Sequence, residues 1–346
     1  MRFYFTEEDH PTRVRAGDIR AALVHARHEV IHGRVGDPPP AGIDMWMHGI
    51  GIEGSPPIAD PICEQLLAST APFAVFQLCD GETLCFEQIR GDVASRARLF
   101  LRNHWPRAAT RMPEFARGRT GWLPPMLKPM APHAGRPLQE RSHGAVFFGT
   151  RTGMSNVTDG RNAREELVRL MLKSELPFRG GLLPHRDPRY PVPRGLEGER
   201  LSEREHGAVL RDARICLAPW GNHPVTYRLF EGLAFRCLVV AQSIRDTTFV
   251  DGGLEAGKHY VEVAPDLSDL IEVVRHYLAH LDEAQGIADA GHAHFARHFA
   301  SRGGLISPYI FRATVASWGS LYRVSEAHGL GALSRSFAAR AFPERF

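Results

Sequence analysis

The sequence predicts an α/β fold in which parallel strands alternate with helices, arranged in two domains. Its 346 residues are enough for two domains of roughly 100–200 residues each. Short apolar runs alternate with segments whose apolar residues recur at helical spacing, which is typical of parallel sheets covered by helices. Between the two halves, Trp122–Pro137 holds five prolines and little periodicity, and we interpret it as the crossing between the domains.

In the first half, three short apolar runs predict buried strands: Asp44–Ile52, Pro72–Cys79 and Arg96–Arg102. Pro61–Ser69, between the first two, carries apolar residues at helical spacing and predicts a helix. This order of strand, helix and strand favours a parallel sheet, because two parallel strands need a crossover between them.

The second half alternates more regularly. Gly144–Gly149 predicts a strand that runs into a glycine-bearing loop, and Arg161–Lys173 predicts the helix after it. Asp159 is the expected N-cap of that helix, with Glu165 and Glu166 in its early turns, where acidic residues are favourable. The remaining expected elements are the strands Pro177–Leu183, Arg214–Pro219, Cys237–Gln242 and His259–Val263, and the helices Ser202–Arg211, Pro224–Phe235, Asp266–Tyr277 and Glu283–Phe299. Such sheets bind ligands at the carboxyl ends of their strands, so we expect the site there.

Charge and cysteine content bear on the class of protein. Forty-two Lys and Arg residues against 39 Asp and Glu give a net charge of +3, which is too balanced to indicate a nucleic-acid partner. The five cysteines form no CxxC pair and stand in apolar runs, which is typical of reduced core thiols. The first residues lack the apolar core of a secretory signal, and no run approaches the ~18 apolar residues of a membrane helix. We therefore expect a cytoplasmic protein without a transmembrane segment, and leave peripheral membrane contact open.

The most informative segment is Ile215–Gln242, in which a buried strand runs into a Gly-Asn-His-Pro turn, a helix and a second buried strand. Backbone N–H groups at the start of such a helix form a ready site for an anion. In the helix, Glu231 follows Tyr227 by four residues and Arg228 by three, so it shares a face with either. An Arg near the helix start suits a diphosphate, and a Glu one turn later suits ribose hydroxyls. The alternative is a surface ion pair between Arg228 and Glu231, worth under ~1 kcal/mol.

Several motifs resemble the GT-B glycosyltransferases of the exostosin and protein O-glucosyltransferase families. PWGNHPVTYRLFEGLAFRCLVV is similar to their donor-site segment, in which a short polar turn precedes Arg-Leu-Phe-Glu, small residues, Cys and an apolar strand. LEAGKHYVEVAPDLSDLIEVV and IADAGHAHFARHF resemble the strand and helices that follow it. HGAVFFGTRTG and RNAREELVRLM resemble the first strand, loop and helix of the same domain. The resemblance covers roughly residues 140–300.

The resemblance implies a GT-B fold, with two Rossmann-like domains that face each other across a cleft. It implies an acceptor-side domain at residues 1–138, a nucleotide-sugar-binding domain at 139–307, and helices at 308–346 that cross back to the first domain. The implied activity is that of a hexosyl- or pentosyltransferase of polysaccharide biosynthesis. It would move sugar from a nucleotide-sugar donor, with UDP favoured, to a hydroxyl of a glycan, lipid-linked or protein acceptor. Inversion is favoured by analogy, and no metal or other cofactor is expected, because fixed cations stabilise the leaving diphosphate.

The resemblance also implies roles in donor binding. Glu231 would accept hydrogen bonds from ribose hydroxyls, and Arg228, together with the loop residue Arg151, would neutralise the leaving diphosphate. The expected donor site is completed by residues of the turn and of the helix start, namely Gly221, Asn222, His223, Thr226 and Tyr227.

An inverting reaction needs a base from the first domain to deprotonate the acceptor hydroxyl. Asp80, at the end of an apolar strand, is the first candidate. FAVFQLCDGE resembles FVFSHDWG of exostosins, with Asp80 at the Asp but Cys79 at the His. The alternative for Asp80 is a turn residue in Asp-Gly. Asp44 and His48, which flank another strand, come next, and a core histidine is the favoured interpretation of His48.

Arg236 departs from the family pattern, because it stands where the families usually have a small residue. The late helix contains His292, His294 and His298, two of which have the i,i+4 spacing of helical metal ligands. Without HExxH or a partnering Cys, the metal interpretation is disfavoured. Two other functions stay open: a nucleotide-sugar-binding protein that has lost transfer activity, and a GT-B-shaped enzyme of another reaction, such as an epimerase.

Overall fold

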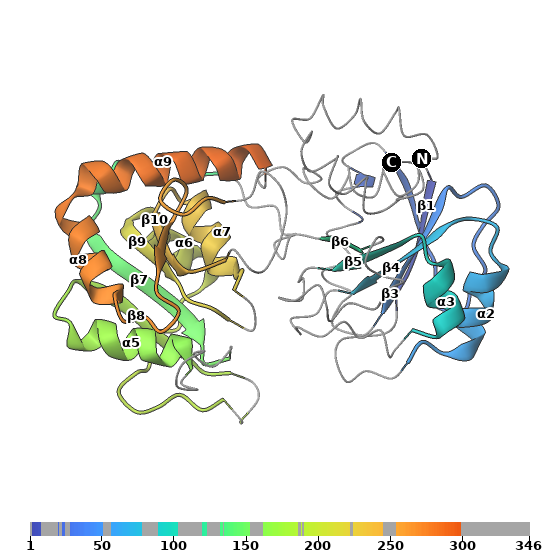
Figure 1. Ribbon diagram of the computed structural model, residues 1–346, viewed down its shortest axis with the longest axis horizontal. Helices are drawn as coiled ribbons and strands as arrows, with labels where there is room; N and C mark the ends of the chain where they lie inside the picture. Colours follow the sequence, from blue (N-terminus) through green and yellow to red (C-terminus); the bar gives the residue numbers. More distant parts are fainter. Residues whose placement is uncertain are drawn as a thin grey trace. The chain divides into compact units, whose positions relative to one another are not determined.

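The computed structural model describes residues 2–7, 20, 23–24, 28–50, 57–77, 89–102, 120–122, 132–133, 135–152, 162–185, 188, 190–221, 224–244 and 254–298. The chain forms two compact units (Figure 1). Described residues up to Trp122 belong to the first unit and those from Pro132 onward to the second. The expected helices at 308–346 lie outside the described residues.

The first unit contains a six-stranded parallel sheet in the order β2-β1-β3-β4-β5-β6. Its strands are β1 (Arg2–Glu7), β2 (Glu29–His32), β3 (Met45–Ile50), β4 (Phe73–Gln77), β5 (Leu99–Arg102) and β6 (Thr120–Trp122), and its helices include α2 (Asp60–Ala68) and α3 (Gly91–Arg96). Buried side chains from these strands and helices form one apolar cluster, which includes Tyr4, Trp46, Ile62, Phe73 and Val93.

Four predicted elements of this unit are confirmed, namely α2, β3, β4 and β5. The predicted start of the third strand at Arg96 is wrong, because Arg96 ends α3 and the strand begins at Leu99. Strands β1, β2 and β6 are not predicted. In β1, the aromatic residues Phe3 and Phe5 are fully buried, but charged residues at both ends of this short strand mask the apolar pattern.

The second unit contains a five-stranded parallel sheet in the order β11-β10-β9-β7-β8. Its strands are β7 (His143–Thr150), β8 (Phe178–Leu183), β9 (Ala213–Ala218), β10 (Leu238–Gln242) and β11 (Val261–Val263). Its helices are the short 3-10 helix η3 (Leu138–Glu140), α5 (Ala163–Lys173), α6 (Glu203–Arg211), α7 (Tyr227–Ala234), α8 (Leu270–Ala279) and α9 (Leu281–His298). The predicted strands and helices of the second half are confirmed, with ends that shift by a few residues.

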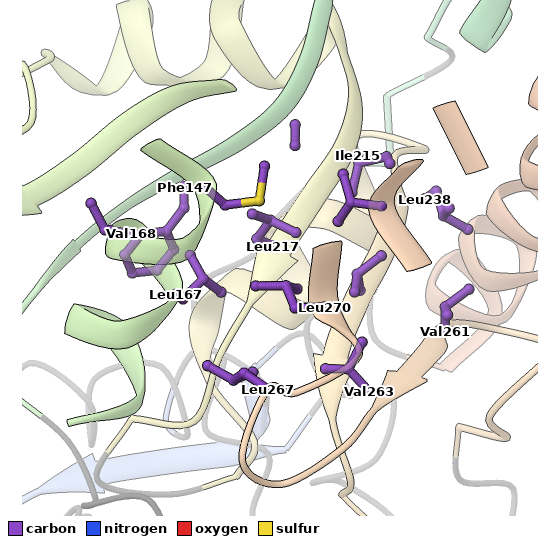
Figure 2. Close-up of a cluster of buried hydrophobic side chains, with 14 of the residues drawn as sticks. Phe147, Leu167, Val168, Ile215, Leu217, Leu238, Val261, Val263, Leu267 and Leu270 are labelled. Carbon is purple, nitrogen blue, oxygen red and sulfur yellow. The ribbon is translucent and has the colours of Figure 1, made fainter. Parts of the chain in front are cut away.

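Alternate residues of the strands face opposite sides of this sheet. Phe147, Ile215 and Leu217 pack with Leu167 of α5 and Leu270 of α8 on one side (Figure 2). The next residues along the strands face the other side, where α6 and α7 pack against β7, β9 and β10. This second side therefore brings the predicted Arg228 and Glu231 of α7 against the sheet.

Two predicted helix starts need correction. The described N-cap of α5 is Asn162, whose side chain accepts from the backbone N–H groups of Arg164 and Glu165 at 3.1 Å. Asp159, the predicted cap, lies outside the described residues. Pro224 lies two residues before Thr226, the N-cap of α7, and so is not in the first turn of the helix.

Arg236 terminates α7 in the left-handed backbone region, with φ of 55°. Its N–H donates to the carbonyl of Leu233 at 3.2 Å, and the N–H of Cys237 donates to the carbonyl of Gly232 at 2.9 Å. These two bonds form a Schellman motif, which usually has glycine where Arg236 stands.

We expect Arg236→Gly to be more stable than Arg236→Ala by about 1 kcal/mol of unfolding free energy, because only glycine adopts this backbone conformation without strain. Both variants lose the ion pair from Nε of Arg236 to Asp289 (2.5 Å), so that loss cancels in the comparison. Urea unfolding of the two variants measures the difference. Equal stability would contradict a strained backbone at this position.

Candidate functional site

The strand order of the second unit reverses direction between β7 and β9, since the chain adds β8 on one side of β7 and then β9, β10 and β11 on the other. Open parallel sheets bind ligands outside the carboxyl ends of their strands at such a switch point. The candidate site is therefore the edge formed by the end of β7, the end of β9 and the start of α7.

Arg164, in the first turn of α5, connects the ends of these two strands. Its Nη1 donates to the carbonyl of Thr150 at 3.1 Å and to Oγ1 of Thr152 at 3.3 Å, and its Nε donates to the carbonyl of Trp220 at 3.3 Å. A Cβ at the predicted site residue Gly221 would overlap Nη2 of Arg164 and lie 3.1 Å from Cγ2 of Thr226. Arg164, Gly221 and Thr226 are thus neighbours at the switch point.

The turn after β9 is fixed to the end of β10. Gln242 is fully buried, and its Oε1 accepts from the backbone N–H of Trp220 at 2.9 Å. Its Nε2 donates to the carbonyl of Pro265 at 2.5 Å, and the indole N–H of Trp220 donates to the carbonyl of Ser243 at 3.0 Å. These hydrogen bonds therefore hold the beginning of the turn that precedes α7 against the end of β10.

Arg228 and Glu231 form the predicted pair on α7, and His206 of α6 joins them. Nε of Arg228 donates to the carbonyl of Phe148 at 2.6 Å, and Nη1 donates to Nε2 of His206 at 3.1 Å and to Oε2 of Glu231. The side chains of Arg228 and Glu231 are 21% and 19% exposed, so the pair is largely buried rather than a surface ion pair. Within the described residues, Nη2 of Arg228 donates to no acceptor.

The carboxylate of Glu231 uses its two oxygens differently. Oε2 contacts Arg228 and lies 3.5 Å from Nε2 of His206, whereas no hydrogen bond from a described residue reaches Oε1. Burial on its own raises the pKa of Glu231, but the interactions of the carboxylate, of which the charge of Arg228 is the largest, hold the pKa below its usual value. Glu231 is therefore an ionised acceptor with one oxygen anchored and one available.

The start of α7 has a buried hydroxyl that no described residue binds. Thr226 is its N-cap and is 8% exposed, yet its side chain caps no N–H group, and its buried Oγ1 bonds to nothing in the described part of the chain. The first N–H groups of a helix are also without intrahelical partners. Tyr227, the next residue, is 39% exposed. A bound anion would satisfy the hydroxyl and the helix start together.

Arg151 follows β7 at the same edge of the sheet. Its Nε donates to Oε2 of Glu165 at 2.8 Å, and its carbonyl accepts from Nδ2 of Asn162 at 2.6 Å. Glu165 also binds Arg169. Three other predicted site residues, Asp80, Asn222 and His223, lie outside the described residues.

In the first unit, His48 of β3 lies beside Thr6 of β1, also at a switch point of the strand order. Nδ1 of His48 lies 2.9 Å from Oγ1 of Thr6, which accepts from the indole N–H of Trp46 at 2.7 Å. His48 is fully buried, and its burial lowers its pKa to about 4, as befits a neutral core histidine. Asp44 accepts from the backbone N–H of Arg2 at the amino ends of the strands, away from the edge where ligands bind.

Two of the helical histidines of α9, His292 and His294, have structural partners. Nδ1 of His292 donates to the carbonyl of Leu233 at 2.9 Å, and the ring of His294 packs against that of His259 with centroids 4.4 Å apart. No three His, Cys, Asp or Glu side chains in the described ranges are arranged to hold a metal ion. Among the described helices, none has the length and apolar character needed to cross a membrane. Cys63, Cys216 and Cys237 are buried free thiols, as predicted for the core.

Two residues of this site were missed by the sequence analysis, Arg164 and His206. Both come from helices that precede the motif, 56 residues before Trp220 and 22 residues before Arg228 respectively. The sequence offers only an indirect indication of these two residues. The strands around α7 are predicted, and a parallel sheet places the starts of its helices at one edge, where residues early in each helix can meet.

Comparisons with known proteins agree with this architecture. Residues 164–303, under half of the chain, match a family model described as glycosyl transferase-like. The chain is similar to sucrose-phosphate synthase from Thermosynechococcus elongatus, with 12% identity and a TM-score of 0.54 over 94% of this chain and 100% of that one. It is also similar to a glycosyltransferase from Rickettsia africae ESF-5, with 11% identity and a TM-score of 0.56 over 90% of this chain and 98% of that one. No curated protein sequence matches. The chain has the predicted two-domain GT-B fold, and the family match with this fold supports a glycosyltransferase.

Proposed function

We propose that the chain is an exostosin-like inverting glycosyltransferase, with a UDP-sugar as the favoured donor. It transfers a hexosyl or pentosyl group to a hydroxyl of a glycan, lipid-linked or protein acceptor, as in polysaccharide biosynthesis. The observation that carries the proposal is a pair of oxygens at the switch point of the sheet, Oγ1 of the N-cap Thr226 and Oε1 of Glu231, to which no hydrogen bond runs from the described residues.

In this proposal, Oε1 of Glu231 accepts the ribose hydroxyls, and the leaving diphosphate lies at the start of α7. Nη2 of Arg228, the hydroxyl of Thr226 and the helix N–H groups donate to the diphosphate, whose negative charge grows in the transition state. Arg151 adds positive charge at the same edge, and Gly221, Asn222, His223 and Tyr227 complete the donor site. The reaction then needs no metal or other cofactor. Asp80, three residues after β4, is the proposed base for the acceptor hydroxyl.

The test is donor turnover without an added acceptor, in which water takes the sugar slowly. UDP-, GDP- and dTDP-sugars are incubated with the protein, and release of nucleoside diphosphate and the first-formed anomer of the sugar are followed. We expect release from one donor class, with the anomeric configuration inverted. Nucleotide binding without release would indicate a binding protein, and conversion of the sugar while still attached to the nucleotide would indicate an epimerase.

Thr226→Val distinguishes an effect on nucleotide binding from an effect on protein stability, because valine keeps the shape of the side chain and removes only the hydroxyl. The unfolding free energy is expected to stay equal or rise by up to about 1 kcal/mol, since a buried unpaired hydroxyl is removed. The Kd for the bound nucleotide is expected to rise about tenfold. Thr6→Val is the matched control, because Thr6 is a buried threonine of the first unit whose hydroxyl bonds to Trp46 and His48, so its loss lowers stability and leaves the Kd unchanged. Unchanged nucleotide affinity in Thr226→Val would contradict the proposed contact.

A further inference from the structure

His206 contacts both members of the Arg228–Glu231 pair from a separate helix. Its Nε2 lies 3.1 Å from Nη1 of Arg228 and 3.5 Å from Oε2 of Glu231. The imidazole ring also packs edge-on against Phe148 of β7, with centroids 5.9 Å apart. The ring is therefore held between the sheet and α7.

His206 lies directly after the capped start of α6. Ser202 and Glu205 form a reciprocal capping box, in which Oγ of Ser202 accepts from the N–H of Glu205 and the Glu205 carboxylate accepts from the N–H of Ser202. His206 is the next residue and lies on the side of α6 that faces β7 and α7. The capping box fixes the backbone from which the imidazole extends, and the contacts with Arg228 and Phe148 hold the ring itself.

The chemistry of the contact assigns the proton on the ring. A guanidinium N–H can only donate, so Nε2 of His206 accepts from Arg228, and the proton of the neutral ring is on Nδ1. A neutral acceptor satisfies one N–H of Arg228 without cancelling the charge of the guanidinium. A carboxylate in the same place would compete with Glu231 and with a bound diphosphate for that charge.

We propose that His206 is a positioning residue of the donor site: its Nε2 accepts from Nη1 of Arg228, and the guanidinium held in this way fixes Oε2 of Glu231, so that Oε1 stays turned toward the nucleotide. This inference rests on the proposed function, because it assigns Oε1 to the ribose. Its physical basis is preorganisation: an anchored carboxylate loses less freedom when the ligand binds.

The test compares His206→Gln with His206→Asn. The amide of glutamine reaches the position of Nε2, whereas the amide of asparagine reaches only that of Nδ1. We expect His206→Asn to raise the Kd for UDP, or for whichever of UDP, GDP, CMP and dTDP binds the wild type, by about tenfold. His206→Gln is expected to keep the Kd within about twofold of the wild type and to melt at the wild-type temperature, whereas His206→Asn removes an acceptor from Arg228 and is expected to melt lower. Calorimetric titration and thermal unfolding provide the two readouts.

His276→Asn is the matched control, because it breaks another contact between a histidine and a glutamate, at 2.9 Å to Glu283, in the same unit. It is expected to leave the Kd unchanged. Wild-type affinity in His206→Asn, or equal loss in the Gln and Asn variants, would overturn the role of His206 and leave the proposed function standing. A wild type that binds none of the four nucleotides would overturn the proposed function and this role with it.

Discussion

Arg228→Met is expected to lower donor turnover by about 100-fold or more, because in the proposed reaction the guanidinium donates to the diphosphate, whose charge grows in the transition state. It also removes the cation that holds the carboxylate of Glu231 ionised. The guanidinium connects three places, the carbonyl of Phe148, His206 and Glu231, so one substitution disturbs both the charge and the geometry of the site. Initial rates of nucleoside diphosphate release measure the loss.

Two further variants separate charge from geometry. Arg228→Lys keeps the charge but loses the planar fork, so it is expected to recover only part of the turnover. In the double variant Arg228→Met with Glu231→Gln, the unpaired carboxylate is gone, and stability is expected to recover while turnover stays low. If Arg228→Met turns over donor at the wild-type rate, Arg228 has no part in the reaction.

Unfolding of the first unit is expected to become easier by about 3 kcal/mol as the pH falls from about 6.5 to 4. Burial lowers the pKa of His48 in the folded protein to about 4, while the unfolded chain has the ordinary value near 6.5. Within this window the unfolded chain binds a proton that the folded protein does not, so stability falls as the pH falls. The stability that the neutral His48 contributes is fully present above this pH window and lost below it.

His48→Asn is the control for this effect, since asparagine reaches the position of Nδ1, where His48 meets Thr6, but does not titrate. Urea unfolding at several pH values between 7 and 4 is expected to show a shallower decline for His48→Asn than for the wild type. Parallel declines in the two proteins would show that His48 is not the group responsible.

The second unit was predictable because its local signals agree with one another. Ser202 opens α6 as expected, and the apolar run at Cys237–Gln242 becomes β10 with only Cys237 left outside the strand. The first unit was harder, because short strands such as β1 carry charged ends and gain their stability from neighbours distant in the sequence. Phe3 of β1 pairs with Met45 of β3, and no local sequence pattern predicts this pairing.

The residues of the candidate site also fall into those that a local pattern predicts and those that it does not. Arg228 and Glu231 lie on one helix, so their spacing predicts that they share a face, and the structure brings them together. Arg164 and His206 reach the site only because β7 and β9 are adjacent in the sheet, and strand order is not encoded in local periodicity. The N-cap of α5 could not be located from residue type alone. Asp and Asn are both favourable N-caps, and the backbone conformation places Asn162, not Asp159, at this position.

The central claim is that the second unit holds the nucleotide of the donor at Glu231. The most direct test is thermal unfolding of the wild type and of Glu231→Gln with UDP, GDP, CMP and dTDP. Ligand at 100 times its Kd adds about 2.7 kcal/mol of stability. We predict that one nucleotide stabilises the wild type and that Glu231→Gln loses this stabilisation. A wild type that responds to none of the four, or a Glu231→Gln variant that responds equally, would contradict the claim.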